Sequence, residues 1–564
     1  MFLQWGAGIV PYHGSRFRRN GGYVMKRSLV SRILAAGMAL AMGVSLTACG
    51  GSSTGADTAA DDSGAETTGD TASEGGSESS GTGEAQATDE EPYEVVLEWL
   101  SIGNTPSEEN LVKIEEAINE ITLPAINCTV NLYPVELSEL ASANTLALST
   151  GEKIDLICSV GTGVGELVTS GLVVPMDEYL GSYGADLQAC LGDALKGGYY
   201  DNQLYGVPNA YIQSEKYGYI ARKDILDKYG ITIDENKLYT LEELGDIFAT
   251  VSAGEGAGFY CVSGQTSVSD TYTEVVGTID KLGATTSAGV LMLEDNWSNT
   301  TIENLYASDS YKKYAEIMYD WAQKGYIPSD AASNTDTNLI QMPTGNYLGS
   351  FYWTTPGGPE GFSTSVGYEM VPVSLADPYK TTDRYQNILW SIPTTSERPD
   401  KAFQFLNFLY GDNDVDSILM FGLEGETYQV IEENESGDKL VEFVEGIDAT
   451  TAPYYCYAGI YGDRLSWPIW APNDIGLNET LREFNETVKN ISPALGYCVT
   501  ITDEMSSKYA AVQSVVSQYT PVISAGAVDP EESLANFNKA LEDAGINDVI
   551  AANQAQLDAW LAEQ

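Results

Sequence analysis

The chain has 564 residues, 43% of them hydrophobic and 19% charged, a composition typical of globular domains rather than fibrous or wholly disordered chains. Its formal net charge is −53, and since six of its 28 basic residues and none of its 81 acidic residues precede Cys49, the chain from Cys49 onward carries −59. This charge repels phosphate backbones and anionic lipid, so it argues against nucleic-acid binding and favours a neutral or cationic ligand over an anionic one.

The first 49 residues contain a basic pair, an apolar run and a cysteine motif, in that order. Lys26 and Arg27 precede fourteen residues of apolar character at 33–46, and Leu46-Thr47-Ala48-Cys49 has the pattern of a lipobox. The run has the usual length of a signal-peptide core and is too short to span a bilayer comfortably. We therefore expect the thiol of Cys49 to carry a lipid that anchors the chain at the extracellular face of a cell membrane.

Two further segments surround this motif. Residues 1–24 are unlike the basic region of a signal peptide, and we interpret them as an extension upstream of the true start, Met25, so that the signal peptide occupies 25–48. Residues 50–92 hold only Gly, Ser, Thr, Ala, Gln, Pro and acidic residues, a composition that cannot offset the entropy of ordering. We predict that 49–92 comprises the lipidated cysteine and a disordered acidic tether with a reach of roughly 35–40 Å.

Histidine and cysteine usage limits the chemistry further. The only histidine, His13, precedes the predicted signal peptide, which excludes His-based acid–base catalysis, Ser-His-Asp and Cys-His nucleophile pairs and imidazole-ligated zinc in the exported chain. Six cysteines besides Cys49 are scattered without a C-x-x-C motif. Their pairing cannot be deduced from the sequence, and we favour buried free thiols because a domain of this size has core enough without disulfides.

From residue 93 onward, short apolar segments alternate with helical patterns. The sequence predicts strands at 94–100, 128–133 and 154–158, and helices at 107–121 and 138–149. This β-α-β-α-β order predicts an α/β fold in which helices connect the strands of a sheet.

Several later helices have well-marked ends. Thr240 and Glu243 have the spacing of a capping box, and a helix at 529–545 begins with Asp-Pro-Glu-Glu and ends at a glycine. A helix at 311–324 has one apolar face, on which Trp321 is expected to pack in the core.

A set of segments occurs in an order that resembles a known family: 154–157 (IDLI), 172–180 (LVVPMDEYL), 202–208 (NQLYGVP), 217–224 (YGYIARKD), 321–327 (WAQKGYI) and 399–409 (PDKAFQFLNFL). From Glu94 to the end, the chain resembles the extracellular solute-binding lipoproteins of ABC importers. The tail segments 422–428 (GLEGETY) and 528–560 resemble the branch that carries the DUF3502 domain, found in carbohydrate-uptake operons of Gram-positive bacteria.

The resemblance implies a two-lobed type II periplasmic-binding-protein fold with a cleft between the lobes and hinge crossovers joining them. The implied function is a membrane-tethered receptor that captures a solute, by family an oligosaccharide, and delivers it to an ABC transporter permease, as a monomer without enzymatic activity or cofactor. The implied parts are the first part of lobe I at 93–211, the first part of lobe II at 212–372, a return to lobe I at 373–420 and a DUF3502-like region completing the lobes at 421–564.

Two loop-like stretches concentrate aromatic side chains with turn formers, 351–358 (FYWTTPGG) and 467–474 (WPIWAPND). Aromatic faces suit the CH faces of sugars and planar amides suit their hydroxyls, so Trp353, Trp470 and Asn473 are candidate ligand contacts. The second stretch matches the position of a cleft loop in the family but lacks the usual Gly-Asn-Gln that follows. Core or hinge packing is the alternative role of both tryptophans.

Three more candidates come from their place along the chain. Thr162 follows the strand at 154–158, at the carboxyl end where a cleft is expected, and Asn209 and Tyr211 lie at the expected first crossing between lobes. Arg222 is expected to form a structural ion pair instead.

A metal site and two other functions are the alternatives to solute binding. Asp412, Asp414 and Asp416 begin like a calcium loop, but Ser417 and Leu423 stand where an EF-hand has Gly and Glu, so this run is interpreted as the start of a helix and no metal is assigned. A secreted carbohydrate-active hydrolase is the main alternative function, because paired carboxylates suffice for glycoside hydrolysis without histidine. An adhesin is less favoured because the chain shows no internal repeats.

Overall fold

The computed structural model describes residues 90–564 except 103–104, 162, 284–286, 288, 412, 450 and 457–459. These residues belong to one compact unit. The predicted upstream extension, the signal peptide, Cys49 and most of the predicted tether lie outside the described residues, as does Thr162. Glu90, near the end of the predicted tether, forms an ion pair of 2.6 Å with Arg398, and its carbonyl accepts a hydrogen bond from Asn127 Nδ2.

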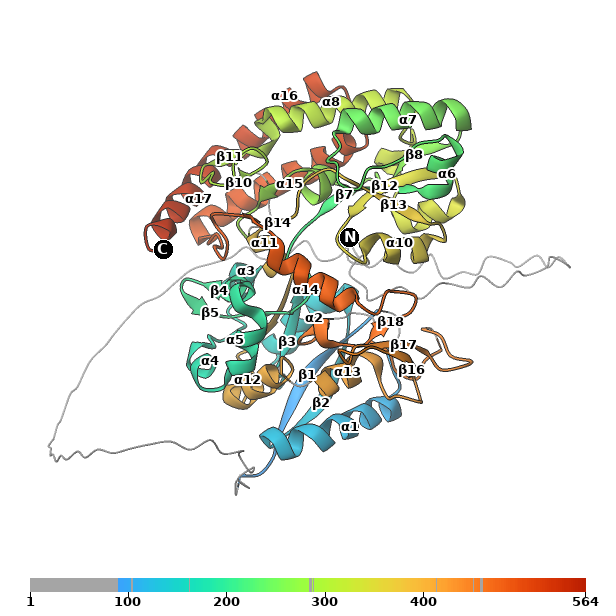
Figure 1. Cartoon of the computed structure of the whole chain (residues 1–564). Coiled ribbons are helices and arrows are strands. Elements are labelled where there is room, and N and C mark those ends of the chain that lie inside the picture. Colours follow the sequence, from blue (N-terminus) through green and yellow to red (C-terminus); the bar gives the residue numbers. More distant parts are fainter. Residues whose placement is uncertain are drawn as a thin grey trace, which may run out of the picture. The chain divides into compact units, whose positions relative to one another are not determined.

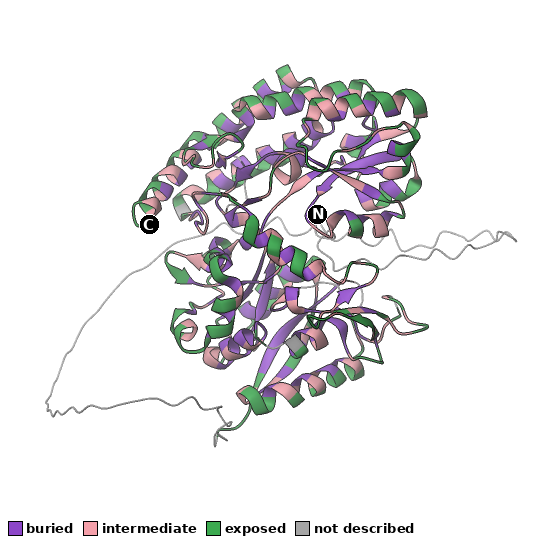
Figure 2. Ribbon diagram, viewed as in Figure 1, coloured by how far each residue is buried: buried purple, intermediate pink, exposed green. Residues whose placement is uncertain are grey.

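Most buried apolar side chains fall into two large cores, which define lobe I and lobe II. The largest fully buried members include Trp99 and Trp390 in lobe I, and Phe248 and Trp321 in lobe II. Figure 2 shows buried residues along the strands and on one face of the covering helices. Trp321 is therefore a core residue, as its helical position predicts.

Lobe I begins with the predicted alternation of strands and helices (Figure 1): β1 (Tyr93–Ser101), α1 (Glu108–Ile126), β2 (Cys128–Glu136), α2 (Leu140–Ser149) and β3 (Ile157–Val160). β1 and β2 pair in parallel, and a parallel bridge joins Leu97 to Leu156. The centre of β1 is buried on both faces because helices and chain cover both sides of a parallel sheet. The Ser107 side chain caps α1, which runs beyond its predicted end until Asn127 closes it in the left-handed conformation.

The rest of lobe I comes from several separate stretches of the chain. β15 lies antiparallel between β3 and β6, and a hairpin of β16 and β17 joins β18. The further elements are α3 (Val164–Thr169), α4 (Asp177–Tyr183), α5 (Ala185–Leu191), β4 (Tyr199–Tyr200), β5 (Gln203–Leu204), β6 (Val207–Pro208), α11 (Thr382–Tyr385), β15 (Ile388–Ser391), α12 (Pro399–Phe408), α13 (Asn413–Phe421), β16 (Tyr428–Glu433), β17 (Lys439–Phe443) and β18 (Ile469–Trp470). α13 confirms that the Asp-rich run at 412–416 leads into a helix.

Lobe II is built on a four-stranded sheet of order β13-β7-β12-β8. β7 (Tyr217–Arg222) is antiparallel to both β12 (Tyr347–Trp353) and β13 (Met370–Ser374), and β12 is parallel to β8 (Tyr260–Ser263). The large core covers one face of this sheet and a smaller core, to which α10 contributes, covers the other. The remaining elements of this part are α6 (Lys223–Lys228), α7 (Leu241–Glu255), β9 (Ile279–Asp280), β10 (Gly289–Met292), β11 (Ile302–Asn304), α8 (Asp309–Gln323), α9 (Asn338–Gln341) and α10 (Gly358–Val366).

Local signals in lobe II act as the sequence predicts. Thr240 and Glu243 form both bonds of the capping box of α7. The Arg222 guanidinium forms an ion pair of 2.6 Å with Asp224 and lies over the ring of Tyr368, a structural role. The tail of the chain adds α15 (Asp503–Ser524), α16 (Pro530–Ala544) and α17 (Ile546–Leu561) to the core of lobe II.

Three chain segments run side by side between the two cores. The backbones of Glu215 and Tyr379 exchange two hydrogen bonds of 2.7 and 2.9 Å. β14 (Tyr379–Lys380) pairs in parallel with β19 (Asn490–Ile491), which follows α14 (Leu477–Thr487). These paired segments are the crossovers that connect lobe I to lobe II.

In the part of the chain that the structure describes, no helix is long and apolar enough to cross a membrane. Cys128, Cys158, Cys261 and Cys498 are buried free thiols and Cys190 is a half-buried one, as favoured from the sequence.

Candidate functional site

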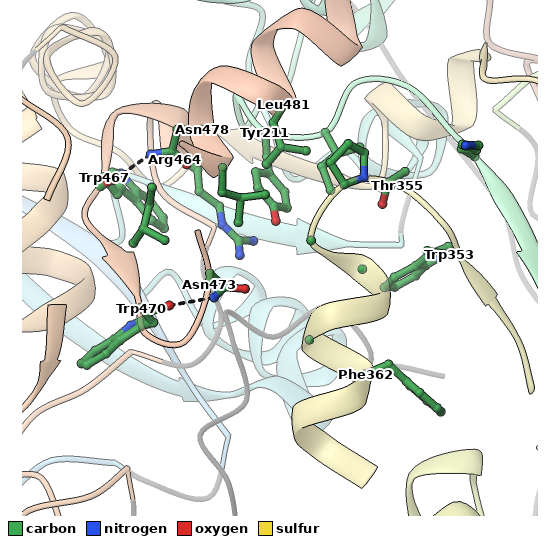
Figure 3. A pocket seen from close by; sticks show the side chains of 18 of the residues that line it. Tyr211, Trp353, Thr355, Phe362, Arg464, Trp467, Trp470, Asn473, Asn478 and Leu481 are labelled. Carbon is green, nitrogen blue, oxygen red and sulfur yellow. Dashed lines mark hydrogen bonds between the residues drawn. The ribbon is translucent and has the colours of Figure 1, made fainter. Parts of the chain in front are cut away.

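A pocket of about 1210 Å³ is lined by residues from both lobes and the first crossover (Figure 3). Lobe II contributes the end of β12 and the start of α10, and lobe I contributes the end of α13 and the loop around β18. The crossover residues from Tyr211 to Tyr217 form a further wall. We call this space the interlobe pocket.

Aromatic side chains occupy several walls of the interlobe pocket. Tyr211 and Trp353 are half-buried, and Trp353 packs against Tyr352 with ring centroids 5.3 Å apart. Trp467 and Trp470 are 4% and 6% exposed. The pocket therefore offers a partly open aromatic side chain at Trp353, whereas the Arg464 guanidinium covers one face of Tyr211 and the two other tryptophans are buried.

At the start of α10, one wall of the pocket is formed by glycines, which have no side chain to occupy the space. Gly357 has φ of +79°, a conformation that L side chains rarely adopt. A Cβ atom at Gly361 would meet nothing within 4 Å. A side chain at position 361 would consequently extend into open space rather than into the protein.

Charged groups in the lining are mostly basic. The charged residues of the lining are Lys216, Arg384, Arg464 and one acid, Glu215. The Arg464 guanidinium lies 3.6 Å from the ring centroid of Tyr211, and Arg384 Nε donates a hydrogen bond of 2.6 Å to the Ile212 carbonyl. Burial lowers the pKa of Arg384, although it remains far above neutrality.

A second cavity of about 840 Å³, the charged cavity, shares Glu215, Tyr217, Trp353 and Arg384 with the interlobe pocket. Its other charged residues are Lys281, Glu274 and Asp383. Glu274 and Lys281 come from lobe II, Glu215 comes from the first crossover, and Asp383 and Arg384 come from α11 of lobe I. A ligand that fills both spaces would therefore contact the hinge directly.

Burial and mutual attraction shift the ionisation of this cavity. Burial raises the pKa of Glu274 to about 7, and the nearby Asp270 carboxylate adds to the rise. Burial lowers the pKa of Lys281, but the attraction of Asp383, Glu215 and two further carboxylates outweighs it and leaves that pKa above its ordinary value. Lys281 is therefore charged at neutral pH, while Glu274 titrates near it.

The family of this chain follows from its match to a protein-family model. The family model described as bacterial extracellular solute-binding protein matches residues 115–414, more than half of the chain. The chain belongs to the bacterial extracellular solute-binding proteins. A second model, described as a domain of unknown function (DUF3502), matches residues 493–562 of this solute-binding protein. Both parts of the resemblance inferred from the sequence are confirmed.

Known proteins resemble the solute-binding protein over most of its length. A carbohydrate ABC transporter substrate-binding protein of Streptococcus pneumoniae is 21% identical over 499 residues, which cover 85% of this chain and 94% of the relative. The N-glycan transport solute-binding protein NgtS of the same species aligns with a TM-score of 0.70 and 20% identity, covering 83% of this chain and 99% of NgtS. FusA of S. pneumoniae, solved with kestose, aligns with a TM-score of 0.55 and 14% identity, covering 84% of this chain and all of FusA. The predicted two-lobed type II α/β fold is thereby confirmed.

The structure brings together four of the residues predicted to contact the solute. Tyr211, Trp353, Trp470 and Asn473 all line the interlobe pocket. Asn209 lies instead in a smaller cavity of about 390 Å³, which Tyr211 also lines. Thr162 lies outside the described residues.

Trp470 is less open than a stacking platform requires. Its ring centroid lies 4.5 Å from that of Phe443, 5.3 Å from that of Phe421 and 5.5 Å from that of Tyr455. Its aromatic faces are consequently occupied by protein, and the packing role considered for it from the sequence accounts for most of its surface.

Sequence reasoning missed the basic residues of the lining and Gly361. Arg464 precedes the aromatic stretch at 467–474 by three residues, and its backbone is held where Ala210 and Asp463 form a parallel bridge. That pairing joins segments some 250 residues apart, so no local sequence pattern predicts it. In the described part of the chain, no cluster of three or more His, Cys, Asp or Glu side chains could hold a metal ion.

Proposed function

We propose that this solute-binding protein captures an oligosaccharide in the interlobe pocket and delivers it to the permease of an ABC transporter. The observation that carries the proposal is a large pocket with aromatic side chains and hydrogen-bonding groups drawn from both lobes. Closure of two lobes around such a pocket removes the ligand from water and signals its presence. The relatives support the ligand class, since NgtS has been solved with Man1GlcNAc and with Man5GlcNAc.

The contacts proposed for the sugar follow from the lining. Trp353 offers a ring face for the CH groups of a sugar ring, and Tyr211, one face of which the Arg464 guanidinium covers, offers the rest of its side chain. The Asn473 side-chain amide donates a hydrogen bond of 2.8 Å to the Trp470 carbonyl, which turns its oxygen toward the remaining space as an acceptor for a hydroxyl. Asn209, which lines the smaller cavity, and Trp470, which lines the interlobe pocket, stay in the proposed set. Thr162 stays in it as a prediction from the sequence.

Several features of the exported protein belong to the same proposal. Cys49 carries a lipid and the segment 49–92 tethers the protein to the extracellular face of the membrane, after removal of a signal peptide at 25–48. Lobe I is taken from 93–211 and 373–420, lobe II from 212–372, and 421–564 completes both. The protein acts as a monomer without a cofactor.

We propose binding rather than hydrolysis as the role of the pocket. A glycosidase places two carboxyl groups on either side of the scissile bond. Among the described residues that line the interlobe pocket, Glu215 is the one carboxylate, and it lies at the border with the charged cavity.

A thermal-shift screen of the purified protein against neutral and acidic oligosaccharides tests the proposal. An oligosaccharide present at 100 times its Kd stabilises the folded state by about 2.7 kcal/mol, which raises the melting temperature by a few degrees. The bound sugar is then recovered and its mass compared with that of the starting material. Unchanged sugar supports the proposal, whereas cleavage products, or a melting temperature that no oligosaccharide raises, would contradict it.

A further inference from the structure

Most of the cations of this protein are paired with carboxylates. All 22 basic residues from Cys49 onward lie in the described part of the chain, and at least fourteen of them form salt bridges with Asp or Glu. Lys216 and Arg464, in the interlobe pocket, form no salt bridge with a residue that the structure describes. The exposed Lys439 and Lys489 also form no such salt bridge, so Lys216 and Arg464 are distinguished by lining the pocket.

The lining of the interlobe pocket has a net positive charge, opposite in sign to the net charge of the protein. The chain has 81 acidic and 28 basic residues, yet the pocket is lined by Lys216, Arg384 and Arg464 and by a single acid, Glu215. Glu215 is engaged within the protein, since burial raises its pKa and Arg384 and Lys281 attract its charged form. The pocket is therefore an electropositive space in an acidic molecule.

Arg464 is positioned as a fixed donor. Its backbone N–H donates a hydrogen bond of 2.9 Å to the Ala210 carbonyl, and its guanidinium stacks on the Tyr211 ring. Stacking holds the plane of a guanidinium while leaving the N–H groups at its edge available. In Figure 3 this guanidinium points into the pocket, in the direction of Asn473.

A carboxylate suits this donor better than a hydroxyl does. A guanidinium presents paired N–H groups that match the two oxygens of a carboxylate, and a charged hydrogen bond contributes about twice as much as a neutral one. The acidic residues elsewhere do not prevent such binding, because charges farther away than roughly 8 Å are screened at physiological ionic strength. The expectation of a neutral or cationic ligand, drawn from net charge alone, does not take this local reversal into account.

We propose that the solute is an acidic oligosaccharide, one of whose carboxylates binds the Arg464 guanidinium while a neighbouring sugar ring lies against Trp353. Lys216 contributes positive potential to the same pocket. The inference rests on the proposed function and narrows it to sugars that contain a uronic or sialic acid.

The test compares each acidic sugar with its methyl ester, which has the same ring and linkage without the charge. Trigalacturonic acid, a hyaluronan tetrasaccharide and sialyllactose are titrated by calorimetry in both forms, and the first two against the third distinguish uronic from sialic acids. We expect at least one acid to bind at least tenfold more tightly than its ester. We expect Arg464→Gln to weaken binding of that acid by about 10- to 100-fold and to abolish the preference over the ester.

Two controls make the result specific. Arg398→Gln removes the same charge from an arginine whose ion pairs lie with Glu90 and Asp400 on the surface, and should leave the preference intact. Lys216→Gln should weaken binding of the acidic sugar less than Arg464→Gln does. Circular dichroism verifies that each variant is folded. Neutral oligosaccharides that bind while every acid fails, or a preference that survives Arg464→Gln, would overturn this inference and leave the proposed function standing. A protein that binds no oligosaccharide of either kind would overturn the proposed function itself.

Discussion

Glu98 is a buried carboxylate that should make the stability of lobe I depend on pH. It lies on β1 and is fully buried. One oxygen accepts a hydrogen bond of 2.7 Å from the Cys158 backbone N–H, and the other, Oε1, has no hydrogen-bond partner among the described residues. Burial raises the pKa of Glu98 to about 8, against the opposing effects of the Cys158 N–H and the Asn144 amide.

The sign of the effect follows from the raised pKa. Between pH 4.5 and 8 the unfolded chain releases the Glu98 proton while the folded chain retains it, so this group lowers the free energy of unfolding as the pH rises. The slope is roughly 1–1.5 kcal/mol per pH unit. Glu98→Gln keeps an oxygen for the Cys158 N–H and removes the ionisation. The free energy of unfolding of the variant should therefore rise steadily relative to that of the wild type from pH 5 to pH 8.

Urea unfolding at pH 5, 6.5 and 8, followed by circular dichroism, measures this difference. Glu94→Gln is the matched control, because Glu94 lies on the same strand with its side chain exposed. Glu98→Gln should approach the wild type in stability at pH 5 and exceed it by more than about 2 kcal/mol at pH 8. A difference between Glu98→Gln and the wild type that is the same at all three pH values would refute the reasoning.

Two further predictions concern local structure in lobe II, each measured by urea unfolding. Thr240→Ala removes the side chain that accepts the Glu243 N–H at the start of α7 and should cost about 1 kcal/mol; an unchanged midpoint would mean that this helix end contributes nothing. Gly349→Ala would place a Cβ atom 2.0 Å from the Ile220 carbonyl oxygen, so it should destabilise the protein by about 2–4 kcal/mol, and a variant as stable as the wild type would show that β12 and β7 are farther apart than described.

The elements that the sequence predicts well are those with local signals. The alternation from β1 to β3 follows from short apolar runs separated by amphipathic helices, and the ends of α7 and α16 follow from their caps. The division of 421–564 between the lobes has no such signal. The hairpin of β16 and β17 packs in lobe I and the helices from α15 onward pack in lobe II, because long-range burial rather than local propensity decides where each segment lies.

The candidate site shows the same limit. Aromatic residues among turn formers pointed to Trp353 and Trp470, which both line the interlobe pocket, but their spacing could not tell which ring is open. Phe421 and Phe443, far upstream in the sequence, cover Trp470. No local sequence pattern predicts that Arg464 lies in the pocket, because its position depends on the pairing of its segment with the first crossover.

The central claim is that the interlobe pocket binds the solute, and Gly361 allows it to be tested directly. Gly361 lies on α10 in the pocket lining, where a Cβ atom would meet nothing within 4 Å. Leucine is a better helix former than glycine by roughly 0.8–1 kcal/mol, so Gly361→Leu should fold while its side chain fills the pocket. Gly181→Leu is the matched control, on α4 and equally free of contacts, and Gly181 is not among the residues that line the pocket.

The measurement is isothermal titration calorimetry with the oligosaccharide that gives the largest thermal shift. We predict one binding site per chain in the wild type and in Gly181→Leu, and an affinity at least tenfold weaker in Gly361→Leu. Wild-type affinity in a folded Gly361→Leu protein would contradict the claim, because it would place the bound solute elsewhere on the molecule.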